Sequence, residues 1–289
     1  MASKVLNMRE PVSMKNGRMI LGFSGWMDGG EVSTGTVEYL RIKLRSHPVA
    51  DIAPEPFFIY SFPGSMEMAA MFRPEVCIAD GIITSYDSPE STFHANPLSR
   101  VVLFESREPN LDWPGFAEAI LEMAAHCNVH EIFFVGSVAG IVPHTRDPRI
   151  HASISEPRLR PMLEQHGLEP TNYEGPASFI TYLMERGPEV GVRVMTLVAE
   201  IPAYVQGKNV RCIEAMVRKL ATILDLDLDI GDLKTMSLEF KKRLNEAVQE
   251  RPDLAELLHK METDYDREVL DAHMDDLRDW FEKQGFTIN

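Results

Sequence analysis

The sequence predicts an α/β domain, a three-layer α/β/α core with a mostly parallel sheet, followed by a separate helical extension. Three observations lead to this prediction. Short apolar segments alternate with amphipathic ones along most of the chain, a glycine-rich loop joins the first such pair, and only helical periodicity remains near the C-terminus. We expect a core domain over residues 1–228 and an acidic helical extension over residues 229–289.

The apolar segments of the core domain predict its strands. They are rich in β-branched and aromatic residues on both faces, which is typical of parallel strands covered by helices on both sides. The predicted strands cover residues 18–23, 57–60, 101–104, 132–135 and 192–198. The amphipathic segments between them predict helices over residues 32–45, 114–126, 158–166, 177–185 and 210–224.

The extension predicts two helices with no strand between them. Apolar residues recur at three- and four-residue steps over residues 233–248 and again over residues 254–277. Pro252 separates the two series, because proline disfavours the helical conformation in the residue before it. The second helix is expected to end near Gly285. Each helix carries an apolar stripe, so we expect a hairpin or arm that packs against a partner surface.

Composition and charge exclude several classes of protein. The net charge is −15, and the stretch from Asp225 onwards holds 18 acidic and 9 basic residues, so binding to nucleic acid is disfavoured. No apolar run approaches the ~18 residues that cross a bilayer, and the first residues lack the apolar stretch of a signal peptide. A cytoplasmic protein without membrane contact is expected. Three widely separated cysteines predict no disulfide and no metal site, and buried, inert thiols are the simplest interpretation.

The glycine-rich loop after the first predicted strand is the first candidate site. Gly25, Trp26, Asp28 and Gly29 lie where exposed backbone N–H groups at a helix N-terminus bind anions. The alternative is a structural turn in which Asp28 caps the helix. The loop also contains half of a nucleophile elbow around Ser24, but tryptophan replaces the last glycine of G-x-S-x-G. A serine hydrolase is therefore disfavoured.

The segment from Val142 to His151 is the second candidate site. It follows a predicted strand, and loops at the carboxyl ends of parallel strands line the ligand crevice of such sheets. His144, Thr145, Arg146 and Arg149 offer the donors that hold a phosphate or a carboxylate. The alternative that stays open is a rigid loop whose arginines pair with the acidic surface or with a neighbouring subunit.

Glu200 and Tyr204 follow the last predicted strand and are expected to face the same crevice. A lone carboxylate in that position is more often the partner of an arginine than a catalytic base, and Arg146 is the expected partner. No set of residues completes a catalytic, nucleotide-binding or metal-binding motif. The sequence therefore predicts no cofactor and no metal.

Several segments, in this order, resemble the proteasome-assembly-chaperone-2 family in its bacterial and archaeal branch. They are Gly22-Phe23-Ser24-Gly25-Trp26-Met27-Asp28-Gly29-Gly30, Val142-Pro143-His144-Thr145-Arg146, Gly175-Pro176 and Leu197-Val198-Ala199-Glu200-Ile201-Pro202-Ala203-Tyr204. The acidic stretch over residues 257–266 also resembles the helical end of that family. The resemblance spans roughly residues 15–270.

The resemblance implies a core similar to nucleoside phosphorylases and related hydrolases, assembled as a homo-oligomer. It also implies a link to chaperoned proteasome assembly. Some archaeal relatives dock through a C-terminal hydrophobic-Tyr-any tripeptide, whereas this sequence ends in Thr287-Ile288-Asn289. Docking on a proteasome ring by that route is therefore not expected.

Together these observations favour a non-enzymatic, self-assembling interaction or chaperone-like protein. Its expected partners are further copies of itself and another protein assembly. The alternative is a small-molecule enzyme or sensor with a phosphorylase-like crevice that binds an anionic ligand. In that alternative the two candidate loops bind the ligand, and Glu200 orients it or acts as a base.

Overall fold

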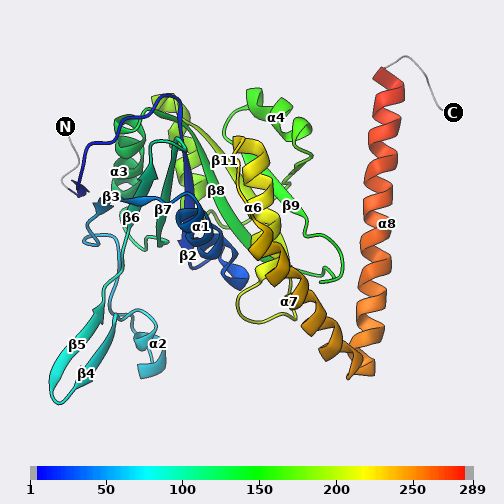
Figure 1. Ribbon diagram of the computed structural model, residues 1–289, viewed down its shortest axis with the longest axis horizontal. Helices are drawn as coiled ribbons and strands as arrows, with labels where there is room; N and C mark the ends of the chain where they lie inside the picture. The colour runs from blue at the N-terminus through cyan, green and yellow to red at the C-terminus, as the bar shows by residue number, and fades with distance from the viewer. Residues whose placement is uncertain (1–4, 284–289) are drawn as a thin grey trace.

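The computed structural model describes residues 5–283, and the side chains as far as residue 270. Its centre is a nine-stranded sheet in the order β1-β3-β6-β7-β2-β8-β11-β9-β10 (Figure 1). The four central strands run parallel to one another. They are β7 (Val101–Arg107), β2 (Gly17–Ser24), β8 (Val129–Gly140) and β11 (Arg193–Pro202). The predicted α/β fold with a mostly parallel sheet is confirmed.

The outer strands extend the sheet on both sides, and all their pairings are antiparallel except that of β9 with β10. They are β1 (Leu6–Met8), β3 (His47–Ile52), β6 (Thr92–Asn96), β9 (Ile150–Ile154) and β10 (Glu169–Pro170). No sequence pattern predicted these strands, because they are short and several of their residues are polar.

Helices cover both faces of the sheet, and the buried core has two layers as a result. One face packs against α3 (Trp113–His126) and α5 (Phe179–Arg186), the other against α1 (Val32–Lys43) and α6 (Val210–Leu224). Alternate residues of one central strand enter opposite layers. This explains why the central strands are apolar on both faces.

The strand predicted over residues 57–60 is wrong. This segment is a loop, and Phe57 is fully buried in an edge-to-face contact with Phe116 of α3, at 4.9 Å between ring centroids. The Phe57 carbonyl accepts backbone N–H groups from Asn110 and Leu111 instead of those of a neighbouring strand. The segment is apolar because it closes one end of the core.

Between β3 and β6 the chain leaves the body as an arm, residues 62–87 (Figure 1). The arm contains α2 (Met66–Ala70) and a separate two-stranded sheet of β4 (Glu75–Ala79) and β5 (Ile82–Asp87). On the other side of the molecule, α4 (Arg160–Gln165) lies between β9 and β10. The sequence analysis predicted a helix over residues 158–166 but no arm.

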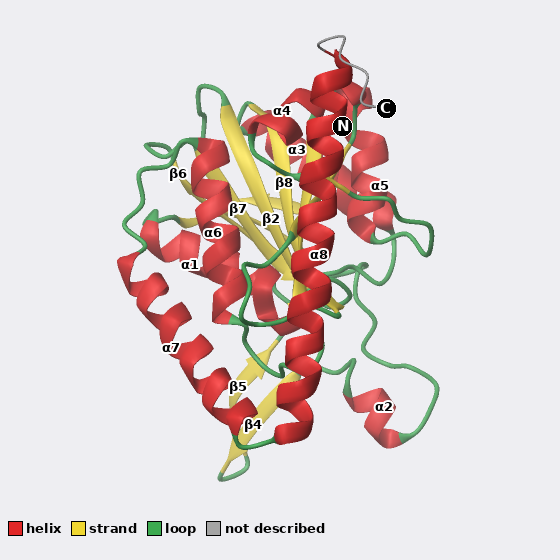
Figure 2. Cartoon of the chain, turned by 90° about the vertical axis from the view of Figure 1, so that its right-hand side faces the viewer, coloured by secondary structure: helices red, strands yellow, loops and turns green. Residues whose placement is uncertain are grey.

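The extension consists of α7 (Gly231–Gln249) and α8 (Pro252–Lys283), separated where Pro252 predicted a break. From α6, α7 leads away from the sheet, and α8 turns back along the β9 side of the body (Figures 1 and 2). The predicted helix end near Gly285 and the tripeptide 287–289 lie outside the described residues. In the described part of the chain, no helix is both long and apolar enough to span a bilayer.

Candidate functional site

The loop that connects β8 to β9, residues 141–149, meets the extension at the carboxyl end of the central strands. The sheet topology places this loop where the sequence analysis expected it, beside the end of β11. The loop side chains, however, turn towards α7 and α8. The chain itself therefore supplies the groups that contact the second candidate site.

Arg146 is held between two carboxylates of α8. Its Nε and Nη2 donate to the two carboxylate oxygens of Asp266, both at 2.8 Å, and its Nη1 donates to Glu262 at 3.1 Å. Thr145 donates its hydroxyl proton to the same Glu262 oxygen. The hydrogen bonds from Arg146 lower the pKa of Asp266 and fix the charged forms of both groups. Arg146 therefore pairs with the acidic surface of the chain, which is one of the two interpretations left open for the loop arginines, the other being the binding of a ligand anion.

Arg149 makes a second connection to α8. Its guanidinium lies 4.1 Å from the centre of the Tyr265 ring, donates to Glu268 at 2.6 Å, and also donates to the Tyr265 carbonyl at 3.3 Å. In return, the Tyr265 hydroxyl donates to the carbonyl of Asp147 at 2.7 Å. The Tyr265 ring covers one face of the guanidinium. Glu268 and the Tyr265 carbonyl accept N–H groups that a ligand anion would need.

His144 is a buried, neutral structural histidine. Its backbone N–H donates to the Tyr204 hydroxyl at 2.8 Å, and the same hydroxyl lies 2.7 Å from Nδ1. The Asn245 Oδ1 of α7 can only accept, so Nε2 carries the ring proton and donates to it at 2.9 Å, and Nδ1 of the neutral ring accepts the proton of the Tyr204 hydroxyl. Burial lowers the pKa of His144 and keeps the ring uncharged. Each ring nitrogen has a partner, so the ring connects Tyr204, just after the end of β11, to Asn245 of α7.

Two basic residues hold the backbone of the loop. Lys241 of α7 donates to the Thr145 carbonyl at 2.9 Å. Arg211 of α6 donates twice to the Arg146 carbonyl and once to Asp147 at 3.1 Å. The basic side chains near the loop are therefore used to bind protein groups.

Glu200 does not pair with Arg146, contrary to expectation. Its carboxylate lies 3.5 Å from Nε2 of His151, and this contact lowers the pKa of Glu200 and raises that of His151. The antiparallel register of β11 and β9 places His151 opposite Val198, which puts Glu200 and His151 on the same face as diagonal neighbours. Arg146 lies in the loop before β9 begins and reaches α8 instead.

The residues of the second candidate site converge, but they leave almost no space. His144, Arg146, Glu200 and Arg211 line a cavity of only about 10 Å³ that Phe240 of α7 also lines. A volume of that size holds about one water molecule. The crevice is therefore closed by the extension, and a ligand needs displacement of α7 or α8 to enter.

In the glycine-rich loop, Asp28 caps α1. Its carboxylate accepts backbone N–H groups from Ser33 at 2.8 Å and Thr34 at 3.2 Å, together with the Thr34 hydroxyl at 2.8 Å. These are the N–H groups that would hold an anion, so the helix N-terminus is occupied by an acidic side chain. Burial raises the pKa of Asp28 against the opposing effect of these hydrogen bonds. The contacts favour the structural turn.

The other residues of this loop have distinct environments. Gly25 has a φ of 123°, which only glycine adopts without strain, and a Cβ on Gly29 would lie 2.8 Å from the Ile201 side chain. Trp26 is 67% exposed. Among the contacts of residues 5–270, none joins Ser24 to a histidine, so a nucleophile–base pair is not assembled there.

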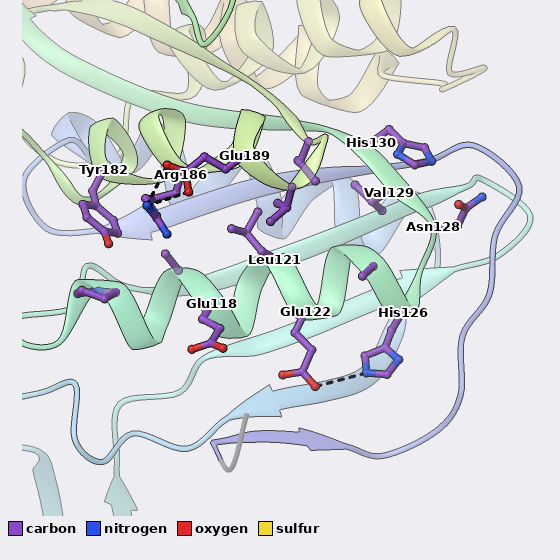
Figure 3. Close-up of a pocket in the computed structure, with 15 residues that line it drawn as sticks. Glu118, Leu121, Glu122, His126, Asn128, Val129, His130, Tyr182, Arg186 and Glu189 are labelled. Carbon is purple, nitrogen blue, oxygen red and sulfur yellow. Dashed lines mark hydrogen bonds and ion pairs between the residues drawn. The ribbon is translucent and has the colours of Figure 1, made fainter. Parts of the chain in front are cut away.

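A wide groove runs along α3 and was not predicted from the sequence. Its volume is about 1,030 Å³, and its floor is formed by apolar side chains such as Leu121 and Val129 (Figure 3). Glu118, Glu122 and Glu189 lie along it. The groove includes the first residue of β8, so it lies at the opposite end of that strand from the loop 141–149. In the sequence, the only trace of this groove is the apolar character of α3. A helix that packs on the core has the same character, so the groove could not be recognised from the sequence.

Two of the three cysteines are buried, as expected, and one is not. Cys127 and Cys212 are buried, and burial raises their pKa values to about 11 and about 12, so neither forms a thiolate near neutral pH. Cys77 lies exposed on β4 of the arm, contrary to the expectation of buried thiols. In the side chains described, no cluster of three or more metal-ligating groups is present.

The fold and this geometry define an α/β protein whose polar loop is bound by its own C-terminal helices. Residues 22–248 match the PAC2 family, and the chain belongs to this family. The resemblance seen in the sequence motifs is thereby confirmed. None of the curated proteins matches the chain.

Among the solved structures that share the fold are three proteins from Mycobacterium tuberculosis and Pyrococcus furiosus. The Mycobacterium tuberculosis protein Rv2714, of unknown function, has a TM-score of 0.80 at 20% identity, over 96% of this chain and 93% of its own. The M. tuberculosis proteasome-assembly chaperone homologue Rv2125 has a TM-score of 0.72 at 24% identity, over 83% and 99%. Pyrococcus furiosus PbaB, an archaeal proteasome activator, has a TM-score of 0.61 at 17% identity, over 86% and 99%. The similarity to Rv2714 covers 96% of this chain, so it includes most of the extension.

Proposed function

We propose that this chain is a non-enzymatic, self-assembling interaction protein with a chaperone-like role. The observation that carries the proposal is the closure of its polar loop: Arg146 and Arg149 are bound by carboxylates of α8, and only about 10 Å³ remain beside them. A phosphate or carboxylate ligand has to compete with these intramolecular partners. The membership in the PAC2 family supports protein partners.

Two of the similar structures support a role in protein assembly. One is described as a proteasome-assembly chaperone homologue and another as a proteasome activator. We carry over from them only the type of activity, which is binding to other protein subunits. The partner that we propose is another copy of the chain, together with a further protein assembly, in the cytoplasm.

We also propose that residues 1–228 and 229–289 are separate units. In the part of the extension whose side chains are described, only Leu233, Ser237 and Met261 are buried, whereas the core domain has two continuous apolar layers. Polar contacts dominate the contacts between the extension and the loop. This pattern is typical of an accessory unit that docks on a finished core.

The experiment has two measurements on the full chain. Light scattering after size-exclusion chromatography is expected to give the mass of two or more copies, and a monomer at all concentrations would contradict self-assembly. A thermal-shift screen with phosphate, nucleosides and carboxylates is expected to give no stabilisation. Stabilisation by one of these compounds that disappears in Arg146→Ala would instead support the enzyme or sensor alternative.

A further inference from the structure

The arm is the most exposed apolar segment in the described part of the chain. Every residue of β4 and β5 is exposed, and α2 beside them has no buried residue (Figure 1). An isolated two-stranded hairpin is only marginally stable in water, and a third strand or a packed face is needed to stabilise it. The arm as it stands lacks such a contact.

The two faces of the hairpin differ in chemistry. The register pairs Val76 with Tyr86 and Ile78 with Ile83, which places these four side chains on one face. They are 48%, 60%, 63% and 63% exposed, in the same order. The other face carries the pairs Glu75 with Asp87, Cys77 with Ser85 and, beside the turn, Ala79 with Ile82.

An antiparallel sheet with one apolar and one polar face normally packs its apolar face on a core. Phe62, Met66, Met68, Met71 and Ile82 are further exposed apolar side chains of the arm, and Ile82 lies on the other face, opposite Ala79. Since a fully exposed side chain of this size offers on the order of 200 Å², the four side chains of the apolar face together expose roughly 470 Å². That area is close to the apolar share, somewhat more than half, of the ~800 Å² that each partner contributes to a standard interface.

We propose that the arms of two copies of this chain pack together through the face formed by Val76, Ile78, Ile83 and Tyr86. This proposal rests on the proposed self-assembly and names the surface that produces it. The face is self-complementary, as a two-fold symmetric interface requires. When two such faces stack, about 10 Å apart as in a small β-sandwich, both copies keep Glu75 and Asp87 on the outer, solvated side.

The groove along α3 is another surface on which the arm could bind. The groove carries Glu118, Glu122 and Glu189, but Arg186 and His126 line it too and pair with Glu189 and Glu122. Charge alone therefore does not select between this groove and a second arm, and the cross-linking test below separates the two.

The first test uses two substitutions on β5, at Ile83 and Ser85, which lie on opposite faces because the register shifts between them and leaves Thr84 without an opposite residue. Ile83→Glu introduces a charge into the proposed interface, and we expect the dissociation constant of the self-associated form to rise at least tenfold in sedimentation equilibrium. Ser85→Glu introduces the same charge on the outer face and is expected to leave that constant unchanged. Equal weakening by both substitutions, or no effect of Ile83→Glu, would overturn the proposal.

A second measurement separates arm-to-arm packing from binding of the arm elsewhere. In a Cys77→Ser background, at least one of Val76→Cys, Ile78→Cys, Ile83→Cys and Tyr86→Cys is expected to form a disulfide-linked dimer under mild oxidation, because a residue near the two-fold axis faces its own copy, and Ser85→Cys is not. Failure of all four to cross-link, although Ile83→Glu weakens association, would place the arm on another surface and overturn the proposal. Circular dichroism checks that the variants keep the α/β core, to which the arm strands contribute no buried residue.

The outcomes also distinguish this inference from the proposed function. A wild-type chain that stays monomeric contradicts both. A wild-type oligomer that is insensitive to Ile83→Glu contradicts only the role of the arm and leaves self-assembly to another surface.

Discussion

Arg146 and Asp266 are joined by two parallel hydrogen bonds of 2.8 Å, which connect the loop after β8 to a helix 120 residues further along the chain. The pair is partly exposed, so its contribution to stability is smaller than that of a buried pair. Its importance is positional, because it lies at the centre of the contacts that hold α8 against the body. The extension is therefore fastened to the core mainly by charges and hydrogen bonds.

Removal of this connection should loosen α8 more than it destabilises the core. For Arg146→Ala we expect little change in the free energy of unfolding, because the pair is exposed and screened by solvent. We also expect faster amide hydrogen exchange in α8, measured by mass spectrometry. Arg158→Ala is the matched control, since Arg158 pairs with its near neighbour Glu156 and touches no part of the extension. Equal exchange in both variants would contradict the assigned role of Arg146.

Acid should release the extension before it unfolds the core. Asp232 at the start of α7 accepts hydrogen bonds from Tyr39 and from Lys43 of α1, which lower its pKa from 3.8 to about 2. Because the folded-state pKa is depressed, the stabilisation is complete above pH 3.8 and is lost as the pH falls towards about 2. Asp266 follows the same direction.

Hydrogen exchange of α7 and α8 as a function of pH measures this release. We expect protection of the extension to fall in that acidic range while the central strands stay protected. Asp232→Asn should already show weaker protection of α7 at neutral pH and a smaller change on acidification. Simultaneous loss of protection in the core and the extension would contradict separate attachment.

The Tyr204 hydroxyl is expected to be structural and not catalytic. In Tyr204→Phe, the buried His144 loses the partner of its backbone N–H and of its Nδ1. An unsatisfied buried group costs about 1–3 kcal/mol, which urea unfolding should show as a lower midpoint with an unchanged slope. Tyr173→Phe removes an exposed hydroxyl that donates to the Pro176 carbonyl, and it should cost less than about 0.5 kcal/mol. If the two substitutions lower the stability equally, the contact between His144 and Tyr204 does not stabilise the loop.

Substitution of Asp28 tests whether the glycine-rich loop is a turn or an anion site. Asp28→Ala should cost about 1 kcal/mol, the typical value for a lost helix cap, while Asp28→Asn keeps an acceptor for the Ser33 and Thr34 N–H groups and should cost less. Chemical denaturation with and without phosphate provides the measurement. Stabilisation by phosphate that persists in Arg146→Ala would contradict the turn, because the capping carboxylate repels an anion.

The central sheet could be predicted from local patterns, and the edges could not. The strands β2, β7, β8 and β11 are buried on both faces, so their apolar runs stand out in the sequence. The segment from Phe57 gave the same signal although it is a loop, because burial against α3 also selects apolar residues. The arm strands alternate apolar and polar residues, but their short length and their exposed position in a long connection concealed them.

The candidate site was predicted in its position but not in its contacts. Loops at the carboxyl ends of parallel strands meet by topology, which is why His144, Arg146 and Glu200 all approach one cavity. The partners of their charges lie elsewhere: Glu200 contacts His151, and Arg146 contacts α8. Nothing in the sequence distinguished these partners from other carboxylates and histidines of the chain.

The sequence by itself determined the α/β class, the order of the central strands along the chain, the two helices of the extension and the break at Pro252. These features follow from periodicity and backbone preference, which act over a few residues. Only the tertiary structure decided that the acidic extension closes the crevice and that the arm presents an uncovered apolar face. Both depend on which surfaces meet across more than a hundred residues or remain without contact, and local patterns carry no information about such pairings.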